Sequence, residues 1–394
     1  MSKEIFYGKQ SIGKDDLISI FEAGKQNLIT VGPKVKLFEK KISKYLNVKH
    51  AIVCNSGTAA MHLALISINL KKNDVVIMPS INFISAFNMA KLFEAKIYLA
   101  DVNKITGQMT PDSVQQCIKK NRLKKIKVII TMYLGGYPEN IIEFYNLKKK
   151  FNCMIIEDAC HAFGANYRFN NKYFKVGSCK HADISTFSFH PIKSITTGEG
   201  GGVTTNKNLL AKRIFLARSH GIIRSKNHWI YDIKQNGMNY RISDINCALG
   251  ISQLKKINIF LKKRKLISDS YIKLISQSNL QNYIKLPDYN SKNKPSYHLF
   301  LVSINFKELK CNKNYLFNFF KQKKIYLQYH YIPIYKFSCF RDKKPDLCKN
   351  SDEYYKNAIS LPIHFDLSYN QQKFVIKVLK QFIENNKKKI KSYV

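Results

Sequence analysis

Short apolar segments alternate with helical patterns through the first 250 residues of this 394-residue chain. The expected strands are Ala51–Cys54, Val75–Met78, Lys96–Val102, Val128–Leu134, Met154–Asp158, Ile184–Phe189 and Val203–Thr205. Apolar residues at helical spacing predict helices between them, among them Thr58–Ile68 and Ile84–Leu92. Strands that alternate with helices form a mainly parallel sheet covered on both faces, so the sequence predicts an α/β fold.

The pattern changes near Gly250. Residues Ile251–Ile275 predict one long basic helix, and helices and strands are mixed in the segments that follow. We therefore expect a large domain over residues 1–250, which includes an N-terminal arm, and a smaller α+β domain over residues 251–394.

The chain is strongly basic, with a net charge of +40 and a pI near 9.8. Such a charge raises nucleic acid or an anionic membrane as a partner. However, the lysines are spread over the whole chain, and arginine, which reads bases and phosphates bidentately, is scarce. No nucleic-acid-binding motif is recognisable. We interpret the charge as a compositional bias and expect no nucleic acid partner.

Nine cysteines are scattered without paired spacing. This pattern indicates neither a disulfide framework nor a metal site and favours a reducing compartment. The N-terminus has no apolar signal core, and no run reaches the ~18 apolar residues that a membrane span needs. We expect a cytoplasmic protein with no membrane partner.

One lysine stands apart from the others. The chain has 66 lysines and arginines in 394 residues, so the segment from His181 to Asn206 would hold about four at the average frequency. It contains only Lys193. Pro191 ends the preceding strand and a glycine-rich turn follows, so Lys193 lies at a strand end, where α/β sheets place ligands. A lysine among aromatic and small residues can have the lowered pKa that Schiff-base chemistry needs. The alternative is an ordinary lysine on a surface turn.

Two further stretches suggest cofactor binding. In Asn55–Ala59 a strand meets a helix N-terminus, where backbone N–H groups and hydroxyls can bind a phosphate, although Ser-Gly-Thr is also an ordinary helix cap. Glu157–His161 ends a buried strand. A carboxylate there could keep a pyridine nitrogen protonated, or it could form a helix cap or a buried salt bridge.

Two more stretches fit the same site. Phe83, in Pro79–Phe83, could stack on a flat ring or belong to the core. The polar stretch Gly237–Asp244 could reach a phosphate or simply start a helix. Together the five features supply a phosphate cradle, a ring stacker, a ring-nitrogen acid and a Schiff-base lysine, which describes a pyridoxal phosphate site.

These motifs resemble those of the DegT/DnrJ/EryC/StrS family of fold-type I, pyridoxal phosphate-dependent sugar aminotransferases, over essentially the whole chain. The matching residues are Asn55–Thr58, Glu157–Ala162, Phe187–Lys193, Thr197–Gly201 and Asn239–Arg241. Within the family the chain most resembles the transaminases of pseudaminic acid synthesis that form UDP-4-amino-4,6-dideoxy-N-acetyl-β-L-altrosamine. That closer resemblance rests on His190–Lys193, Arg218–Gly221, Gln328–Tyr335 and Ser360–Pro362.

The resemblance implies a role for each matching position. Lys193 would hold the cofactor as a Schiff base and move protons, and Asp158 would pair with the pyridine nitrogen. The other implied cofactor contacts are Gly57, Thr58 and Ser188 at the phosphate, His161 and Phe83 at the ring, and Asn239 from a second subunit. His161 stands where glutamine is common, and Phe83 where tryptophan is often found. The implied substrate contacts are Tyr7, Asn27, Leu28, Ile29, Thr30, Gln328, Tyr329, His330 and Tyr331.

The resemblance also implies a homodimer with shared active sites and a reaction. An amino group would pass from glutamate to C4 of a UDP-linked 4-keto-6-deoxy-N-acetyl hexose. A 4-keto sugar of the perosamine or aminoarabinose type is the alternative acceptor, and the sequence leaves this open. Relatives that dehydrate sugars at C3 have histidine in place of the lysine, so Lys193 argues against that reaction. A basic nucleic-acid-binding protein, from a different class, would need its lysines and arginines clustered on one face.

Overall fold

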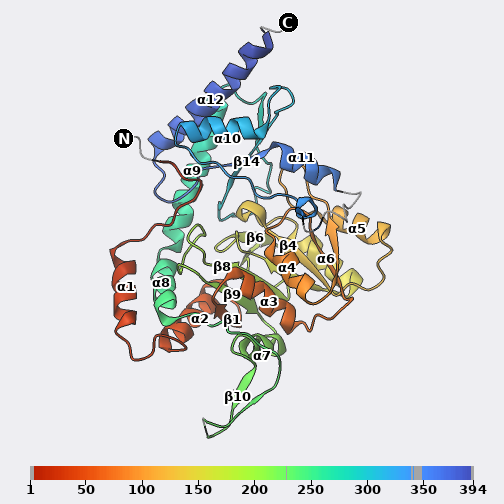
Figure 1. Ribbon diagram of the computed structural model, residues 1–394, viewed down its shortest axis with the longest axis vertical. Coiled ribbons are helices and arrows are strands. Elements are labelled where there is room, and N and C mark those ends of the chain that lie inside the picture. Colours follow the sequence, from red (N-terminus) through yellow and green to blue (C-terminus); the bar gives the residue numbers. More distant parts are fainter. Residues whose placement is uncertain (1–3, 228, 339, 341–347, 392–394) are drawn as a thin grey trace.

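A seven-stranded sheet forms the centre of the computed structural model, which describes residues 4–227, 229–338, 340 and 348–391 (Figure 1). The spatial order is β1–β9–β8–β5–β4–β2–β3, and all neighbouring pairs are parallel except the two that include β9. The strands are β1 His50–Cys54, β2 Val75–Pro79, β3 Lys96–Ala100, β4 Val128–Met132, β5 Met154–Asp158, β8 Ile184–Ser188 and β9 Gly201–Thr205. The predicted α/β fold is confirmed, and each predicted strand lies within two residues of its expected ends.

Helices lie against both faces of this sheet. They are α2 Pro33–Leu46, α3 Gly57–Ser67, α4 Ser85–Leu92, α5 Pro111–Lys120, α6 Ile141–Phe151, α7 Asn208–Ala217 and α8 Asp244–Lys255. In β4, Val128 and Ile130 share a core with α3 and α7, whereas Ile129 between them packs with α5 and α6. Successive residues of a strand point to opposite faces, so this continuous apolar strand is covered on both.

The C-terminal part builds a smaller, three-stranded antiparallel sheet in the order β12–β13–β14. Its elements are α9 Ile257–Gln277, β12 Ile284–Lys285, β13 Phe300–Ile304, α10 Lys313–Gln322, η2 Ile334–Lys336, α11 Lys349–Asn357, β14 Ala358–Leu361 and α12 Tyr369–Lys391. This part has its own core, and Ile5 from the N-terminal segment joins that core. The expected boundary at residue 250 falls inside α8, and the division into two domains stays a prediction.

Shorter elements complete the fold. They are α1 Lys14–Gly24, the 3-10 turn η1 Leu134–Gly136, the hairpin of β6 Asn166–Phe169 with β7 Lys172–Lys175, and the hairpin of β10 Ile222–Arg224 with β11 Tyr231–Ile233. The β10–β11 hairpin projects from the body of the molecule at the bottom of Figure 1.

The expectation of one helix over Ile251–Ile275 is wrong. The chain leaves the helical path at Lys256, which separates α8 from α9. Asp16 of α1 accepts a hydrogen bond from the side chain of Gln253 and pairs with Lys256. Gln253 and Lys256 both lie at the end of α8. The break between α8 and α9 thus coincides with a contact to α1, which helical periodicity in the local sequence does not reveal.

Asp183 ties together the strands that lead to the lysine turn. Its buried carboxylate accepts a hydrogen bond from the Ile155 N–H of β5 at 2.8 Å and pairs with Lys148 and Lys207 at 2.7 and 2.6 Å. Its carbonyl accepts the Thr205 hydroxyl of β9 at 2.7 Å. Burial by itself would raise the pKa of Asp183, but these hydrogen bonds outweigh it and hold the pKa below its usual value.

We predict that Asp183→Asn lowers the free energy of unfolding at pH 7 by about 1–3 kcal/mol, because it removes a buried charge that satisfies several donors. A lowered folded-state pKa stabilises the protein above the unfolded-state value of about 3.9. The loss should therefore be constant above about pH 5 and shrink as the pH falls below that value. Denaturant unfolding across this pH range measures it. Asp232→Asn on the exposed hairpin is the control, and an equal effect of both variants would contradict the account.

All eight cysteines in the described part of the chain are free, and the ninth, Cys339, lies outside it. Among the described helices, none combines the length and apolar character that a membrane crossing requires.

Candidate active site

Lys193 lies on a closed turn directly after β8. The Lys193 N–H donates to the His190 carbonyl at 2.9 Å. The buried Phe189 holds the turn to the rest of the loop, since its N–H donates to Gly200 and its carbonyl accepts from Thr197. The Lys193 side chain is half-buried. Burial lowers its pKa, and the nearby Cys160 and Asp158 oppose that shift.

Asp158 ends the neighbouring strand. Because β5 and β8 are parallel and Asp158 is in register with Thr186, the carboxyl ends of both strands meet at one edge of the sheet. Asp158 is only 3% exposed. Burial raises its pKa, while hydrogen bonds from Cys160 and the charge of Lys193 lower it. The carboxylate and the amine thus act on each other, which places the two predicted catalytic groups in one site.

His161 has a defined tautomer in this site. The Gly135 N–H can only donate, and it donates to His161 Nδ1 at 3.3 Å. Nδ1 therefore accepts, so the neutral ring carries its proton on Nε2, which lies 2.9 Å from the Tyr331 hydroxyl. Burial lowers the pKa of His161 well below its usual value, and the charges of Lys193 and His330 lower it further.

Two other histidines surround His161. The ring of His298 lies 4.3 Å from that of His161, and the ring of His330 lies 6.1 Å away. His330 Nδ1 is 2.8 Å from the Ser360 hydroxyl. His298 is buried, and neither of its ring nitrogens has a hydrogen-bond partner within the described residues. Buried polar atoms of this kind mark a place where a bound molecule or water would supply a partner.

The first turn of α3 lies directly against the end of β8. A Cβ added to Gly57 would come within 2.8 Å of Ser188 Cβ, and one added to Gly201 would come within 2.2 Å of the Ser56 carbonyl. Ser56 caps the helix by accepting the Ala59 N–H at 3.1 Å. The free N–H groups at a helix start bind anions, so Gly57, Thr58 and Ser188 together form a cradle suited to a phosphate.

Other predicted residues border the same region. The ring of Phe83 is half exposed and lies 5.8 Å from that of Tyr331. The ring of Tyr7 lies 5.7 Å from that of His330. The N-terminal segment also covers the lysine turn, since a Cβ on Gly8 would come within 3.3 Å of the Ile192 side chain.

Two predicted groups lie elsewhere in the single chain, and a third, Asn239, contacts Asn55, two residues before Gly57. Tyr329 packs against Phe317 and Tyr355 rather than against His161, and the adjacent Gln328 pairs with Ser360. Residues 27–30 lie beside the start of α8, where Thr30 pairs with Ser243 and the Asp244 N–H donates to Ile29. The carbonyl of Asn239 accepts from the Asn55 side chain at 3.4 Å. The binding roles of these groups stay predictions.

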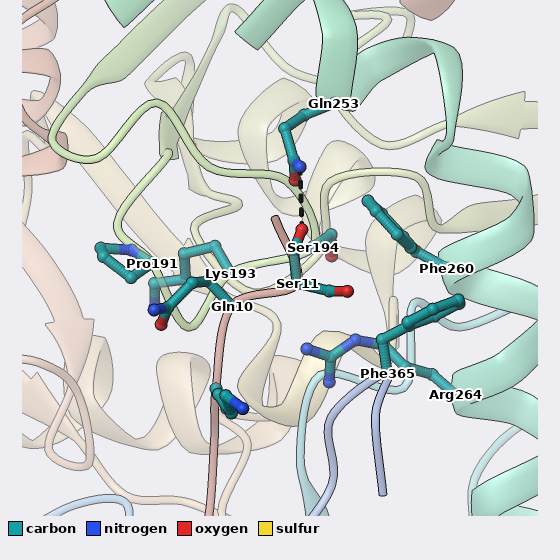
Figure 2. Close-up of a pocket in the computed structure, with 10 residues that line it drawn as sticks. Gln10, Ser11, Pro191, Lys193, Ser194, Gln253, Phe260, Arg264 and Phe365 are labelled. Atoms are coloured by element: carbon teal, nitrogen blue, oxygen red, sulfur yellow. Dashed lines mark hydrogen bonds between the residues drawn. The ribbon is translucent and has the colours of Figure 1, made fainter. Parts of the chain in front are cut away.

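A pocket opens over the lysine turn (Figure 2). It is lined by Lys9, Gln10, Ser11, Pro191, Lys193, Ser194, Gln253, Phe260, Arg264 and Phe365. The N-terminal segment is held there by Gln253, whose side-chain N–H donates to the Ser11 carbonyl at 3.0 Å. Sequence reasoning missed Arg264, because it lies among the lysines of a basic helix and nothing in the local pattern distinguishes it.

The comparisons with known proteins agree with this geometry. Residues 10–380 match the DegT/DnrJ/EryC1/StrS aminotransferase family. A Campylobacter jejuni (serotype O:23/36) protein named UDP-4-amino-4,6-dideoxy-N-acetyl-beta-L-altrosamine transaminase is 38% identical, over 98% of this chain and 99% of its own length. The chain belongs to this aminotransferase family, whose members depend on pyridoxal phosphate.

Two solved structures share the fold and carry the comparison further. Helicobacter pylori PseC, described as an aminotransferase involved in the biosynthesis of pseudoaminic acid, superposes with a TM-score of 0.88 at 28% identity, over 97% of this chain and all of its own. A Streptococcus pneumoniae protein described as a sugar aminotransferase, solved in its PLP form, gives a TM-score of 0.87 at 25% identity, over 98% of this chain and all of its own.

We predict that His161 stays neutral at pH 6, where an exposed histidine with a pKa of about 6.5 is mostly protonated. Its proton should remain on Nε2. Nitrogen-15 NMR of the imidazoles measures both properties, with His161→Gln to assign the signals. Tyr331→Phe should shift the Nε2 signal without protonating the ring. A charged ring, or a proton on Nδ1, would contradict the hydrogen-bond assignment.

Proposed function

We propose that the protein transfers an amino group from an amino acid, glutamate, to C4 of a UDP-linked 4-keto-6-deoxy-N-acetyl hexose. The product would be UDP-4-amino-4,6-dideoxy-N-acetyl-β-L-altrosamine, for pseudaminic acid biosynthesis. The observation that carries the proposal is the meeting of Lys193 and Asp158 at the ends of two adjacent parallel strands. The full-length similarity to a transaminase that is named for this product supports the choice of substrate.

The residues present fit pyridoxal phosphate. Gly57, Thr58 and Ser188 would bind its phosphate, Asp158 its ring nitrogen and Lys193 its aldehyde carbon. The close approach at Gly57 and the unpartnered nitrogens of His298 support this fit, because they leave room and hydrogen-bonding capacity for a polar ligand. When bound, the cofactor supplies a protonated ring that withdraws electrons from the carbon losing its proton.

Lys193 carries the proton chemistry in this proposal. Its amine would take the proton from the donor's α-carbon as a general base and return it to C4′ of the cofactor, a contribution of typically about 10²–10⁴-fold. Burial lowers the pKa of Lys193, which increases the fraction of the neutral amine that is available to accept a proton near neutral pH. Keeping water out of this buried edge strengthens the electrostatic effect of Asp158 on a protonated ring nitrogen.

His161 would act as a neutral hydrogen-bonding group. Its proton on Nε2 is directed to the Tyr331 hydroxyl, and Tyr331 in turn lies beside the ring of Phe83. Phe83 would contact one face of the cofactor ring, and Tyr7 and His330 would contact the sugar. These side chains form a continuous set around the Lys193 turn, which supports a single site for both substrates.

A panel of UDP- and dTDP-linked 4-keto sugars tests the acceptor, with glutamate as the donor. Amino transfer to the UDP-linked N-acetyl sugar should exceed transfer to perosamine- or aminoarabinose-type precursors. If the enzyme prefers a perosamine- or aminoarabinose-type precursor, the proposed acceptor sugar is wrong and the amino-transfer reaction stands.

We also propose a homodimer with shared active sites, in which Asn239 and residues 27–30 reach the partner's site. Several apolar side chains are well exposed in the single chain, among them Phe21, Leu28, Ile29 and Val31, and a dimer interface would cover them. Sedimentation should give about twice the 45.7 kDa chain mass. A monomer that is fully active would contradict the shared site.

We predict that Lys193→Ala folds but loses turnover and the yellow colour of the bound cofactor, because the amine that would bind the cofactor and move the proton is removed. Absorption spectra and an amino-transfer assay measure the two effects. The exposed Lys180→Ala is the matched control and should behave as the wild type. Normal turnover in Lys193→Ala would end the assignment.

We predict that Asp158→Asn keeps the fold and loses most of its activity, because an amide cannot hold a protonated ring nitrogen. Circular dichroism checks the fold, and the amino-transfer assay measures the loss. A variant with wild-type rates would assign Asp158 a purely structural role.

A further inference from the structure

Arg264 of α9 is a buried cation with unusual partners. It is only 3% exposed, and the hydrogen bonds that it makes with the described part of the chain all go to main-chain carbonyls. They join it to Tyr297, His298, Ile363 and Ile192, at 3.4, 3.3, 3.2 and 3.5 Å respectively. Among the described ion pairs none includes Arg264, whereas the buried Asp16, Asp183 and Arg218 each pair with an opposite charge.

This environment leaves the charge of Arg264 uncompensated. Carbonyl groups carry partial charges only, and the distances of 3.2–3.5 Å are long for N–H···O bonds, which cluster at about 2.9–3.0 Å. Burial lowers the pKa of Arg264 to about 10, so the side chain is still charged at neutral pH. A buried charge is expensive unless it is paired, so the site favours an anion.

The guanidinium lines the same pocket as Lys193. In Figure 2, Arg264 extends from α9 toward the space between Ser194 and Phe365. The charge of Arg264 also lowers the pKa of Lys193, so the two cations lie within each other's field. The rings of Phe260 and Phe365 pack edge to face at 5.0 Å and form an apolar wall beside them. A low-dielectric wall strengthens the attraction of both cations for an anion.

The two proposed substrates offer two kinds of anion. The amino donor carries an α-carboxylate on the very carbon whose proton Lys193 would remove. The sugar nucleotide carries a diphosphate, but on C1, at the far side of the ring from the reacting C4. An anion site beside Lys193 therefore matches the donor. The planar guanidinium also matches a carboxylate with two parallel hydrogen bonds.

We propose that Arg264 binds the α-carboxylate of the amino-acid donor and so positions its α-carbon beside Lys193. This inference rests on the proposed amino-transfer function. Arg264 is a binding and positioning residue in this account, and its carbonyl contacts hold the guanidinium in place in the absence of the donor.

The two halves of the reaction can be measured separately in stopped-flow spectra of the cofactor. For Arg264→Gln, the glutamate concentration that half-saturates the donor half-reaction should rise about 10- to 100-fold, because a charged hydrogen-bonded pair is lost. The acceptor half-reaction with the sugar nucleotide should change by less than about twofold. Arg264→Lys keeps the charge but not the planar guanidinium, so its half-saturating glutamate concentration should lie between those of the wild type and Arg264→Gln. The exposed Arg168→Gln is the matched control and should match the wild type.

Ligand-induced thermal stabilisation gives a second measurement that needs no turnover. Glutarate is a dicarboxylate without an amine, so it can occupy the anion site without reacting. It should raise the melting temperature of the wild type and of Arg168→Gln but not of Arg264→Gln. UDP should stabilise all three proteins equally. The melting temperature without ligand shows whether Arg264→Gln folds, and Arg264→Lys tests the proposal if it does not.

Each contrary result overturns a different statement. Unchanged glutamate saturation in both Arg264 variants overturns the role of Arg264 and leaves the proposed function standing. If Arg264→Gln loses stabilisation by UDP but still binds glutarate, the guanidinium binds the diphosphate. This result also overturns the proposed role of Arg264. A wild type that reacts with glutamate but with no sugar nucleotide overturns the proposed acceptor, and the glutamate saturation of the Arg264 variants then decides the role of Arg264. A wild type that reacts with no amino acid overturns both.

Discussion

The parallel pairing of β5 with β8 is the constraint on which the site depends. This pairing places Asp158 and the start of the Lys193 turn at one edge of the sheet, although 34 residues lie between Asp158 and Lys193 in sequence. Asp183 reinforces the pairing at the opposite ends of the strands, because its carboxylate accepts the Ile155 N–H and its carbonyl accepts the Thr205 hydroxyl. The backbone of the sheet thus fixes the positions of Asp158 and the Lys193 turn, and the loops supply the other side chains of the site.

Buried charge distinguishes the site from the structural core. In the core, Arg218 is compensated by Glu39, and Asp183 is compensated by two lysines. At the site, burial raises the pKa of Asp158, lowers that of Lys193 and lowers that of His161. Perturbed ionisable groups gathered in one cleft are typical of active sites, where the missing stabilisation is supplied by substrate and cofactor.

Much of the fold and the central pair of the site could be predicted from the sequence, because both follow from local patterns. Short apolar segments that alternate with helical patterns predicted the sheet, Asp158 ends one of these strands, and Lys193 lies on the turn after another. The break at Lys256 could not be predicted, because it depends on Asp16 more than 200 residues away. Strand alternation also fails at residues 328–331. Within the described residues that segment makes a single bridge, between Gln328 and Ser360, and Tyr329 and Tyr331 face different neighbours.

The most direct test of the account is to locate the covalent attachment of the cofactor. Borohydride reduction of the purified yellow protein, followed by peptide mass mapping, identifies the lysine that carries the pyridoxyl group. The account predicts one modified peptide, which contains Lys193 and none of the other lysines near the pocket, such as Lys9. A pyridoxyl group on a different lysine, or a protein that takes up no pyridoxal phosphate, would contradict it.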